Sequence, residues 1–200
     1  MNHPPEDAHL AWHELARKTV YKARVFTVEE SHRRSSDGAE SDYYLIDSPD
    51  WCNVIATVQR EDGVECFVMA RQYRHGSQTI TVEFPGGIVD PGEEPDAAAL
   101  REFQEETGYT ADRLVLIGKV NPNPAFMSNA AHTFVAINPH QITDQALDAT
   151  ERLDSELVPV EEVLNGLRPD FHVHSIMVTA LLWYERYRSD GKGYAERFSS

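Results

Sequence analysis

The chain has 200 residues, a length that fits one domain with a short extension. Its 33 acidic residues against 18 basic ones give a net charge of −15, which disfavours binding to nucleic acid because such a surface repels the phosphate backbone. No apolar run approaches the roughly 20 residues that a membrane helix needs, and the polar start MNHPPEDAHLAW does not have the pattern of an export signal. We therefore expect a soluble, cytoplasmic protein that binds neither nucleic acid nor membrane.

The N-terminal part of the chain is predicted to be mostly β-structure. Residues 1–8 are expected to be disordered, and Ala8–Arg17 is expected to form a short helix. β-branched and aromatic residues are frequent in Thr19–Arg34 and in Glu40–Asp47, and the intervening Ser35–Gly38 is typical of a turn. The two segments are therefore expected to pair as a hairpin of long strands.

The rest of the chain is predicted to form a mixed sheet with helices packed on it. Strands are expected at Trp51–Gln59, Val64–Gln72, Leu114–Val120, His132–Ile137 and Arg152–Val160, and helices at Pro95–Thr107, 161–167 and 174–188. The first two of these strands flank Asp62 and Gly63, a pair that favours a tight hairpin turn. Cys52 and Cys66 lie in apolar runs without metal-ligand spacing, so they are expected to be buried thiols in a reducing cytosol.

A cluster of acidic residues lies on the predicted helix between Pro95 and Gly108, two residues that suit the first helical position and the position just after the end. At 100° per residue, Glu102, Glu105 and Glu106 share one face. Like charges at this spacing destabilise a helix, and near its C-terminal end the helix dipole adds to the cost. Carboxylate oxygens are the ligands that Mg²⁺ prefers. We therefore expect a Mg²⁺ site on this face, with Mn²⁺ as an alternative ion.

The spacing around this helix decides between a metal site and a merely solvated acidic face. Gly87, Glu93 and the run Arg101–Tyr109 (REFQEETGY) resemble the Nudix box of the Nudix hydrolase family. The resemblance implies an α/β fold, an α/β/α sandwich with a mixed central sheet, to which this chain adds a β-rich N-terminal extension. It also implies hydrolysis of a pyrophosphate linkage. Phe103 and Tyr109 replace the usual aliphatic residues of the box and are expected to pack inward.

The resemblance assigns a role to each residue of the box. Glu102 and Glu106 match the principal Mg²⁺ ligands, and Glu105 matches a further ligand or a water-holding acid. The carbonyl group of Gly86 matches a backbone ligand of the metal. Four residues are expected to be structural, with the arginine paired to the first glutamate so that the loop is held against the helix: Gly87, Glu93, Arg101 and Gly108.

Residues outside the box resemble those of ADP-ribose and nucleoside-diphosphate-sugar pyrophosphatases. Arg71 and Arg74 in RQYR and Glu83 in EFPGG are expected to bind the substrate, although surface charge at a strand end is the alternative for the arginines. Pro124 stands where this subgroup has a proline, whereas the surrounding NPNPAF departs from its S-P-G-F. Glu151 matches a loop glutamate that serves as catalytic base, and a solvated loop acid is the alternative.

Histidines and aromatic residues add little to this assignment. His172 and His174 have the spacing of a metal-binding pair, but the resemblance implies a structural cap at the start of the last helix. Four aromatic residues can stack on a nucleobase or pack in the core, and the sequence does not decide between these: Trp12, Tyr43, Tyr44 and Trp51.

The function that the resemblance favours is Mg²⁺-dependent hydrolysis of ADP-ribose or a similar nucleoside diphosphate sugar to a nucleoside monophosphate and a sugar phosphate. One alternative is the same chemistry on a dinucleoside polyphosphate, NADH or a coenzyme A derivative. Another is a non-catalytic Nudix module that senses a nucleotide. Related pyrophosphatases pack their N-terminal strands across two subunits, so residues 1–48 are expected to mediate a homodimer and residues 49–200 to form the Nudix domain.

Overall fold

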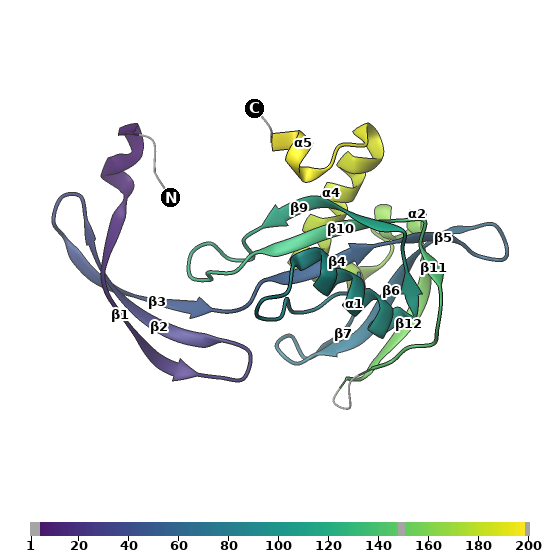
Figure 1. Cartoon of the computed structure of the whole chain (residues 1–200), viewed down its shortest axis with the longest axis horizontal. Helices are drawn as coiled ribbons and strands as arrows, with labels where there is room; N and C mark the ends of the chain where they lie inside the picture. Colours follow the sequence, from purple (N-terminus) through teal and green to yellow (C-terminus); the bar gives the residue numbers. More distant parts are fainter. Residues whose placement is uncertain (1–4, 148–150, 199–200) are drawn as a thin grey trace. The chain divides into compact units, whose positions relative to one another are not determined.

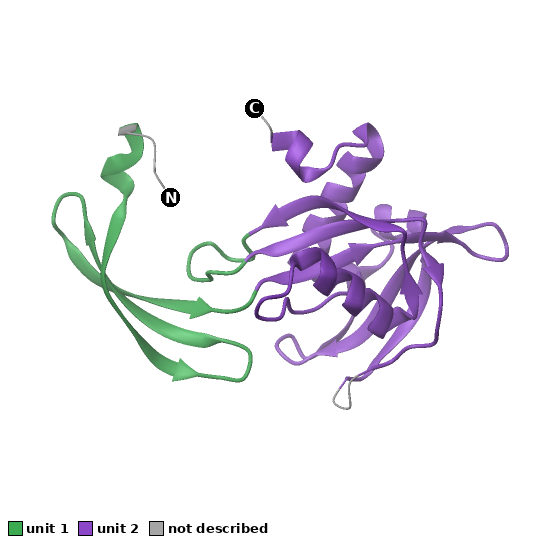
Figure 2. Ribbon diagram, viewed as in Figure 1, with its two compact units in different colours: residues 1–49, 121–129 green, residues 50–120, 130–200 purple. Residues whose placement is uncertain are grey.

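The computed structural model describes residues 5–147 and 151–198. The chain forms two compact units, coloured separately in Figure 2. The N-terminal unit comprises residues 1–49 and 121–129, and the main unit comprises residues 50–120 and 130–200. Residues 121–129 are thus grouped with the N-terminal strands, and the predicted division into residues 1–48 and 49–200 stays a prediction.

The N-terminal unit is a three-stranded antiparallel sheet preceded by one short helical turn. Its elements are the 3₁₀ helix η1 (Pro5–Leu10) and strands β1 (Trp12–Lys22), β2 (Thr27–Ser35) and β3 (Glu40–Asp47), in the sheet order β1-β2-β3. The predicted pairing of the second and third of these strands is confirmed, with Arg34 opposite Glu40.

Three predictions for the N-terminal unit are wrong in whole or in part. The expected helix at Ala8–Arg17 is mostly strand, because β1 pairs with β2 from Trp12 onward and cross-strand bonds, such as Ser31 Oγ to Glu14 at 2.6 Å, outweigh local helix propensity. The expected long strand at 19–34 is broken by a turn in which the Ala23 amide donates to the Phe26 carbonyl at 2.9 Å. The predicted disorder of residues 1–8 is wrong from Pro5 onward, and residues 1–4 lie outside the described residues.

The main unit contains nine strands and five helices among its described residues, arranged as in Figure 1. The strands are β4 (Trp51–Ile55), β5 (Thr57–Gln59), β6 (Glu65–Arg74), β7 (Thr79–Glu83), β8 (Tyr109–Thr110), β9 (Arg113–Val120), β10 (Ala131–Ile137), β11 (His140–Gln141) and β12 (Leu153–Pro159). The helices are α1 (Pro95–Thr107), α2 (Val160–Leu164), α3 (Pro169–His172), α4 (Ser175–Asp190) and α5 (Tyr194–Phe198). The predicted strands and helices are present within a few residues of their expected ends, except that the single strand expected at Trp51–Gln59 is divided into β4 and β5.

The strands of the main unit divide between two larger sheets. β4 runs parallel to β10, and β10 pairs antiparallel with β9. In the second sheet β6 pairs with β5, β7 and β12, all antiparallel. The predicted hairpin around Gly63, whose φ is 81°, is confirmed only for β5 and β6, because β4 pairs with the distant β10 instead.

Helices cover both faces of these sheets, which confirms the predicted α/β/α sandwich. On one face Phe103 of α1 belongs to a core cluster with Val54 and Val68, and on the other Met177 of α4 belongs to a core cluster with Phe84. Full burial of one such side chain contributes roughly 1.5–3 kcal/mol. Phe103 is buried and Tyr109 packs against the same cluster, and both cysteines are buried, as expected. Within the described ranges, none of the helices combines the length and the apolar character needed to cross a membrane.

Candidate active site

The local sequence fixes both ends of α1, the helix that presents the acidic residues. Pro95 occupies the first turn, where its missing N–H costs no hydrogen bond. Gly108 ends the helix with φ 75°, and its amide donates to the carbonyl of Gln104 at 2.8 Å. A Cβ at Gly108 would lie only 2.2 Å from the carbonyl oxygen of Thr143. Glycine is therefore required here both for its backbone conformation and for close packing.

Glu106 is the most deeply buried acid of the helix, with 4% of its surface exposed. Its Oε2 accepts a hydrogen bond from the Gly86 amide at 2.8 Å, which ties the helix to the preceding loop. Burial, together with the negative charges of Glu102 and Glu151, raises the pKa of Glu106 to about 8 despite that hydrogen bond. This carboxylate is thus held in a place that favours either a proton or a cation.

Glu102 lies directly beneath the loop at Gly87. A Cβ at Gly87 would meet the Glu102 carboxyl carbon at 2.5 Å, so only glycine leaves room for this carboxylate. Burial raises the pKa of Glu102 as well, although Arg101 opposes the effect. Glu105 lies further out, with 44% of its side chain exposed.

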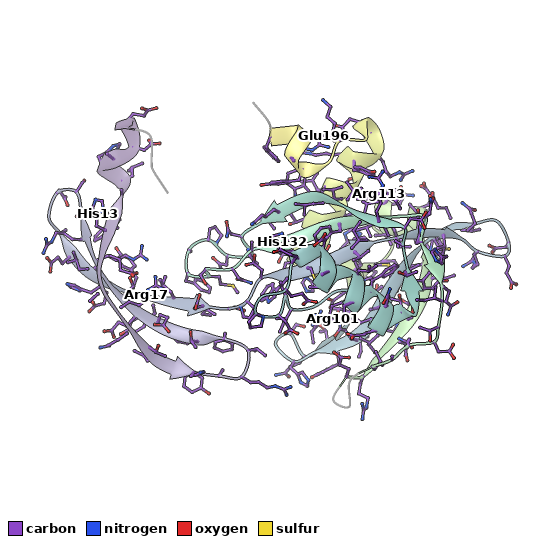
Figure 3. All side chains as sticks on the ribbon, in the orientation of Figure 1. His13, Arg17, Arg101, Arg113, His132 and Glu196 are labelled. Carbon is purple, nitrogen blue, oxygen red and sulfur yellow. The ribbon has the colours of Figure 1, made fainter. Side chains whose placement is uncertain are left out.

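Arg101, which is labelled in Figure 3, connects the loop before α1 to the acidic cluster. Its Nε and one terminal nitrogen donate to the two carboxylate oxygens of Glu93 at 3.1 and 3.0 Å, which confirms the predicted pair. Its other terminal nitrogen donates to Glu102 at 2.9 Å and to Glu105 at 3.2 Å. The hydrogen bonds that it donates to Glu93 are the main cause of a raised Arg101 pKa. A single guanidinium therefore orients three of the acids in the box.

A cavity of about 1320 Å³ opens in the main unit beside these residues. Six of the residues singled out in the sequence line it: Arg74, Glu83, Gly86, Gly87, Glu106 and Glu151. Trp51 lines it too, whereas Arg71, Glu102 and Glu105 are not among its lining residues. The fold thus brings β4, the β6–β7 turn, the loop before α1 and the start of α4 together around one space.

In the wall of this cavity the buried Glu83 forms an ion pair with Arg74, whose side chain is 42% exposed. The Nε of Arg74 donates to Glu83 Oε1 at 2.6 Å, a terminal nitrogen donates to the other carboxylate oxygen, and Thr81 donates to the same carboxylate. Burial raises the pKa of Glu83, but the hydrogen bonds and charge of Arg74 outweigh it and leave that pKa lowered. Glu83 therefore stays ionised and holds the guanidinium in place.

Arg71 takes a different position from the one expected of a substrate-binding residue. Its guanidinium lies 3.4 Å from Glu156 and 3.5 Å from Asp170, and Arg168 bridges the same two acids at 3.0 Å each. This network joins β6, β12 and α3. Arg71 is thus paired with acids of the fold, and its role toward a substrate stays a prediction.

Two polar residues of the cavity wall were not singled out from the sequence in this role. Asn53 on β4 is 3% exposed, and its Oδ1 has no hydrogen-bond partner among the described residues. His174 precedes α4, but its side chain makes no capping hydrogen bond, which corrects the expected structural cap; its Nε2 lies 3.6 Å from Glu83 instead. The sequence signal for Asn53 is that it is the one amide inside the apolar run WCNVIATV.

The prediction of a metal site depends on the types of donor atom at the acidic cluster, not on an arrangement of ligands in the structure. Across residues 5–147 and 151–198, no three His, Cys, Asp or Glu side chains converge in the geometry of a metal site. His172 is also engaged elsewhere, with its Nε2 3.0 Å from the carbonyl of Val163. The assignment of Mg²⁺ to Glu102, Glu105 and Glu106 therefore stays a prediction.

Comparison with known proteins agrees with this architecture. The model of the NUDIX domain matches residues 52–181. ADP-ribose pyrophosphatase of Bacillus subtilis (strain 168) is 28% identical over 151 residues, which cover 75% of this chain and 80% of that protein. ADP compounds hydrolase NudE of Escherichia coli (strain K12) is 28% identical over 156 residues, which cover 78% of this chain and 82% of that protein.

A solved structure supports the same relationship. The crystal structure of an ADP compounds hydrolase superposes with a TM-score of 0.74 at 27% identity, over 90% of this chain and 96% of that one. The family match spans more than half of the chain and includes every residue of the acidic box. This chain therefore belongs to the Nudix family and is a Nudix hydrolase.

Proposed function

We propose that this hydrolase cleaves the pyrophosphate bond of ADP-ribose or a similar nucleoside diphosphate sugar in a reaction that depends on Mg²⁺. The observation that carries the proposal is the Glu106 carboxylate, buried at 4% exposure beneath the Gly86 amide in the wall of a cavity of about 1320 Å³. A carboxylate in such a place is stabilised by a bound cation. Relatives named for hydrolysis of ADP-ribose and ADP compounds support the choice of substrate.

The donors around Glu106 fit a hard divalent cation. Glu102 and Glu106 are adjacent acidic residues of one helix face, burial raises the pKa of both, and the glycine loop closes over Glu102 without a side chain. Oxygen ligands of this kind suit Mg²⁺ or Mn²⁺. When bound, the cation supplies charge neutralisation at the diphosphate and lowers the pKa of a coordinated water. The Gly86 amide holds one oxygen of Glu106 and so orients the other.

Further residues of the cavity support the remaining roles. Glu151 lines the cavity, and its charge contributes to the raised pKa of Glu106, so the two carboxylates are near one another. We assign to Glu151 the role of the base that accepts the proton of the attacking water. Arg74 is held by Glu83 with its guanidinium at the cavity wall, which suits contact with the substrate's phosphates.

Product analysis tests this function. With Mg²⁺ and ADP-ribose in ¹⁸O-labelled water, the expected products are AMP and ribose 5-phosphate, with the label in one of the two phosphates. The panel also contains a dinucleoside polyphosphate, NADH and a coenzyme A derivative. A higher kcat/KM for one of these would replace the proposed substrate, and no product from any of them would favour a nucleotide-sensing module.

We also propose that residues 1–48 mediate a homodimer. β1 is an edge strand of its sheet, all of its residues are exposed, and Leu15 and Tyr21 present 44% and 61% of their surface. A long exposed edge strand with apolar side chains is a ready surface for a second chain.

Light scattering tests the dimer. The wild-type protein is expected to have twice the mass of one chain, and Leu15→Glu with Tyr21→Glu is expected to give monomers. Leu182→Glu is the control, because Leu182 is 48% exposed on α4 in the main unit. A monomeric wild type, or a dimer that survives both changes in β1, would contradict the proposal.

A further inference from the structure

Asn53 is a buried amide whose hydrogen bonds are incomplete. It lies in β4 between Cys52 and Val54, is 3% exposed, and its Oδ1 has no partner among the described residues. An unsatisfied buried polar group of this kind costs roughly 1–3 kcal/mol, and nearly all such groups in folded proteins are satisfied. An apolar residue at this position would avoid that cost. The presence of an amide is therefore explained by a ligand that forms a hydrogen bond with it.

The position of Asn53 connects it to the reacting centre. It lines the same cavity as Glu106 and Glu151. A Cβ at Gly86 would lie 2.7 Å from the Asn53 Cα, and the Gly86 amide is the group that binds Glu106. Gly86 therefore lies between the Asn53 backbone and the buried Glu106 carboxylate, so a ligand of Asn53 within this cavity lies close to the acidic cluster.

The start of α4 presents further unsatisfied polar atoms to this cavity. The Nδ1 of His174 is buried without a partner among the described residues, and no side chain caps the helix there. The first amides of a helix have no acceptor within the helix, so the turn that begins at Ser175 directs donors outward. Ser175 and Ile176 line the cavity with His174. This wall therefore offers donors and acceptors side by side.

The hydrogen-bonding capacity of the Asn53 amide and the His174 imidazole indicates which kind of ligand can bind them. A phosphate oxygen accepts but does not donate, so it cannot satisfy the Asn53 Oδ1. A hydroxyl group both donates and accepts, and it can satisfy an amide in either orientation and an imidazole in either tautomer. A sugar offers several hydroxyl groups within one ring, next to its phosphate.

We propose that Asn53 binds a hydroxyl group of the sugar half of a nucleoside diphosphate sugar and so determines specificity for that half. The inference rests on the proposed function and deepens it. It makes Asn53 a contact to the substrate rather than a support of the fold.

The test compares two substrates in wild-type protein and in Asn53→Val. One substrate is ADP-ribose, and the other is the P²-methyl ester of ADP, which keeps the pyrophosphate and has a methyl group in place of the sugar. The variant is expected to lower kcat/KM about tenfold or more for ADP-ribose and to leave it within about twofold for the methyl ester. Asn53→Ser, which keeps a hydroxyl group, is expected to retain more of the rate on ADP-ribose.

Thr133→Val is the matched control. Thr133 is 3% exposed and stands opposite Asn53 in the register of β10 with β4, but it is not among the cavity-lining residues. This variant is expected to leave the ratio of the two kcat/KM values unchanged. Thermal unfolding completes the design: Asn53→Val is expected to keep or raise Tm, because it removes an unsatisfied buried group.

The outcomes separate the two proposals. Equal changes on both substrates, or a lowered Tm or failed folding of Asn53→Val, would assign Asn53 a structural role and overturn the inference while the proposed function stands. If the wild-type protein cleaves neither compound, the proposed function fails and the inference fails with it.

Discussion

Replacing Glu106 by Gln is expected to lower kcat by roughly 10³-fold while the protein stays folded. The glutamine side chain keeps a carbonyl oxygen that can accept the hydrogen bond that the Gly86 amide donates to Glu106 at 2.8 Å, so the loop stays in place. What the variant loses is the negative charge that a divalent cation requires. Steady-state kinetics on ADP-ribose at saturating Mg²⁺ checks the rate, and circular dichroism checks the fold. An undiminished rate would remove Glu106 from the mechanism.

The same variant is expected to stabilise the metal-free protein at alkaline pH. Burial raises the pKa of Glu106 from its ordinary value of 4.5 to about 8, so the folded state holds a proton that the unfolded state has lost between those pH values. The stability linked to this group is therefore complete below about pH 4.5 and is lost as pH rises to about 8. The loss amounts to at most about 5 kcal/mol, and glutamine avoids it.

Urea unfolding in the presence of EDTA measures this effect. The free energy of unfolding of wild-type protein minus that of Glu106→Gln is expected to fall between pH 5 and pH 9. A difference that stays constant over this range would show that the carboxyl group titrates normally and that its burial has been misjudged.

Replacement of the two adjacent loop glycines by alanine is expected to have different effects. The change at Gly86 lowers the stability of the fold, and the change at Gly87 lowers the activity. A Cβ at Gly86 would lie 2.1 Å from the Cys52 carbonyl oxygen, a backbone atom that cannot yield, so Gly86→Ala is expected to destabilise the fold by several kcal/mol. A Cβ at Gly87 would meet the flexible end of Glu102 at 2.5 Å. Gly87→Ala is therefore expected to keep most of the stability but to displace this carboxylate and lower kcat about 10²-fold.

Thermal unfolding and kinetics on the two variants check this contrast. Gly193→Ala serves as control, because its nearest contact would be 3.4 Å and its φ is not positive. A Gly87→Ala protein with full activity would show that the position of Glu102 is unimportant. A Gly86→Ala protein with unchanged Tm would show that the loop packs less closely against β4 than described.

The elements that local sequence specifies were predicted best. α1 runs from Pro95 to Thr107 as expected, because a proline and a glycine mark its ends within the chain itself. The part of β1 up to Arg17 was mistaken for a helix because its conformation depends on pairing with β2 rather than on its own residues. β4 was assigned to a hairpin, although its partner β10 lies far away in the sequence. Pairing between distant segments leaves little trace in a single sequence.

The same distinction holds for the site. The pair of Arg101 with Glu93 was predicted because both residues belong to one short pattern. The position of Arg71 depends on Glu156 and Asp170, residues on β12 and α3 that no local pattern connects to it. Asn53 became a candidate only when the fold placed an unsatisfied amide in the cavity wall.

Calorimetric titration with Mg²⁺ at pH 7, in buffers that differ in ionisation enthalpy, tests most directly whether the acids of α1 hold a divalent cation. Because the pKa of Glu106 is about 8 in the metal-free protein, cation binding is expected to release close to one proton per ion at this pH. Glu106→Gln is expected to bind at least tenfold more weakly and to release no such proton. Equal affinity in the two proteins, or wild-type binding without proton release, would contradict the account.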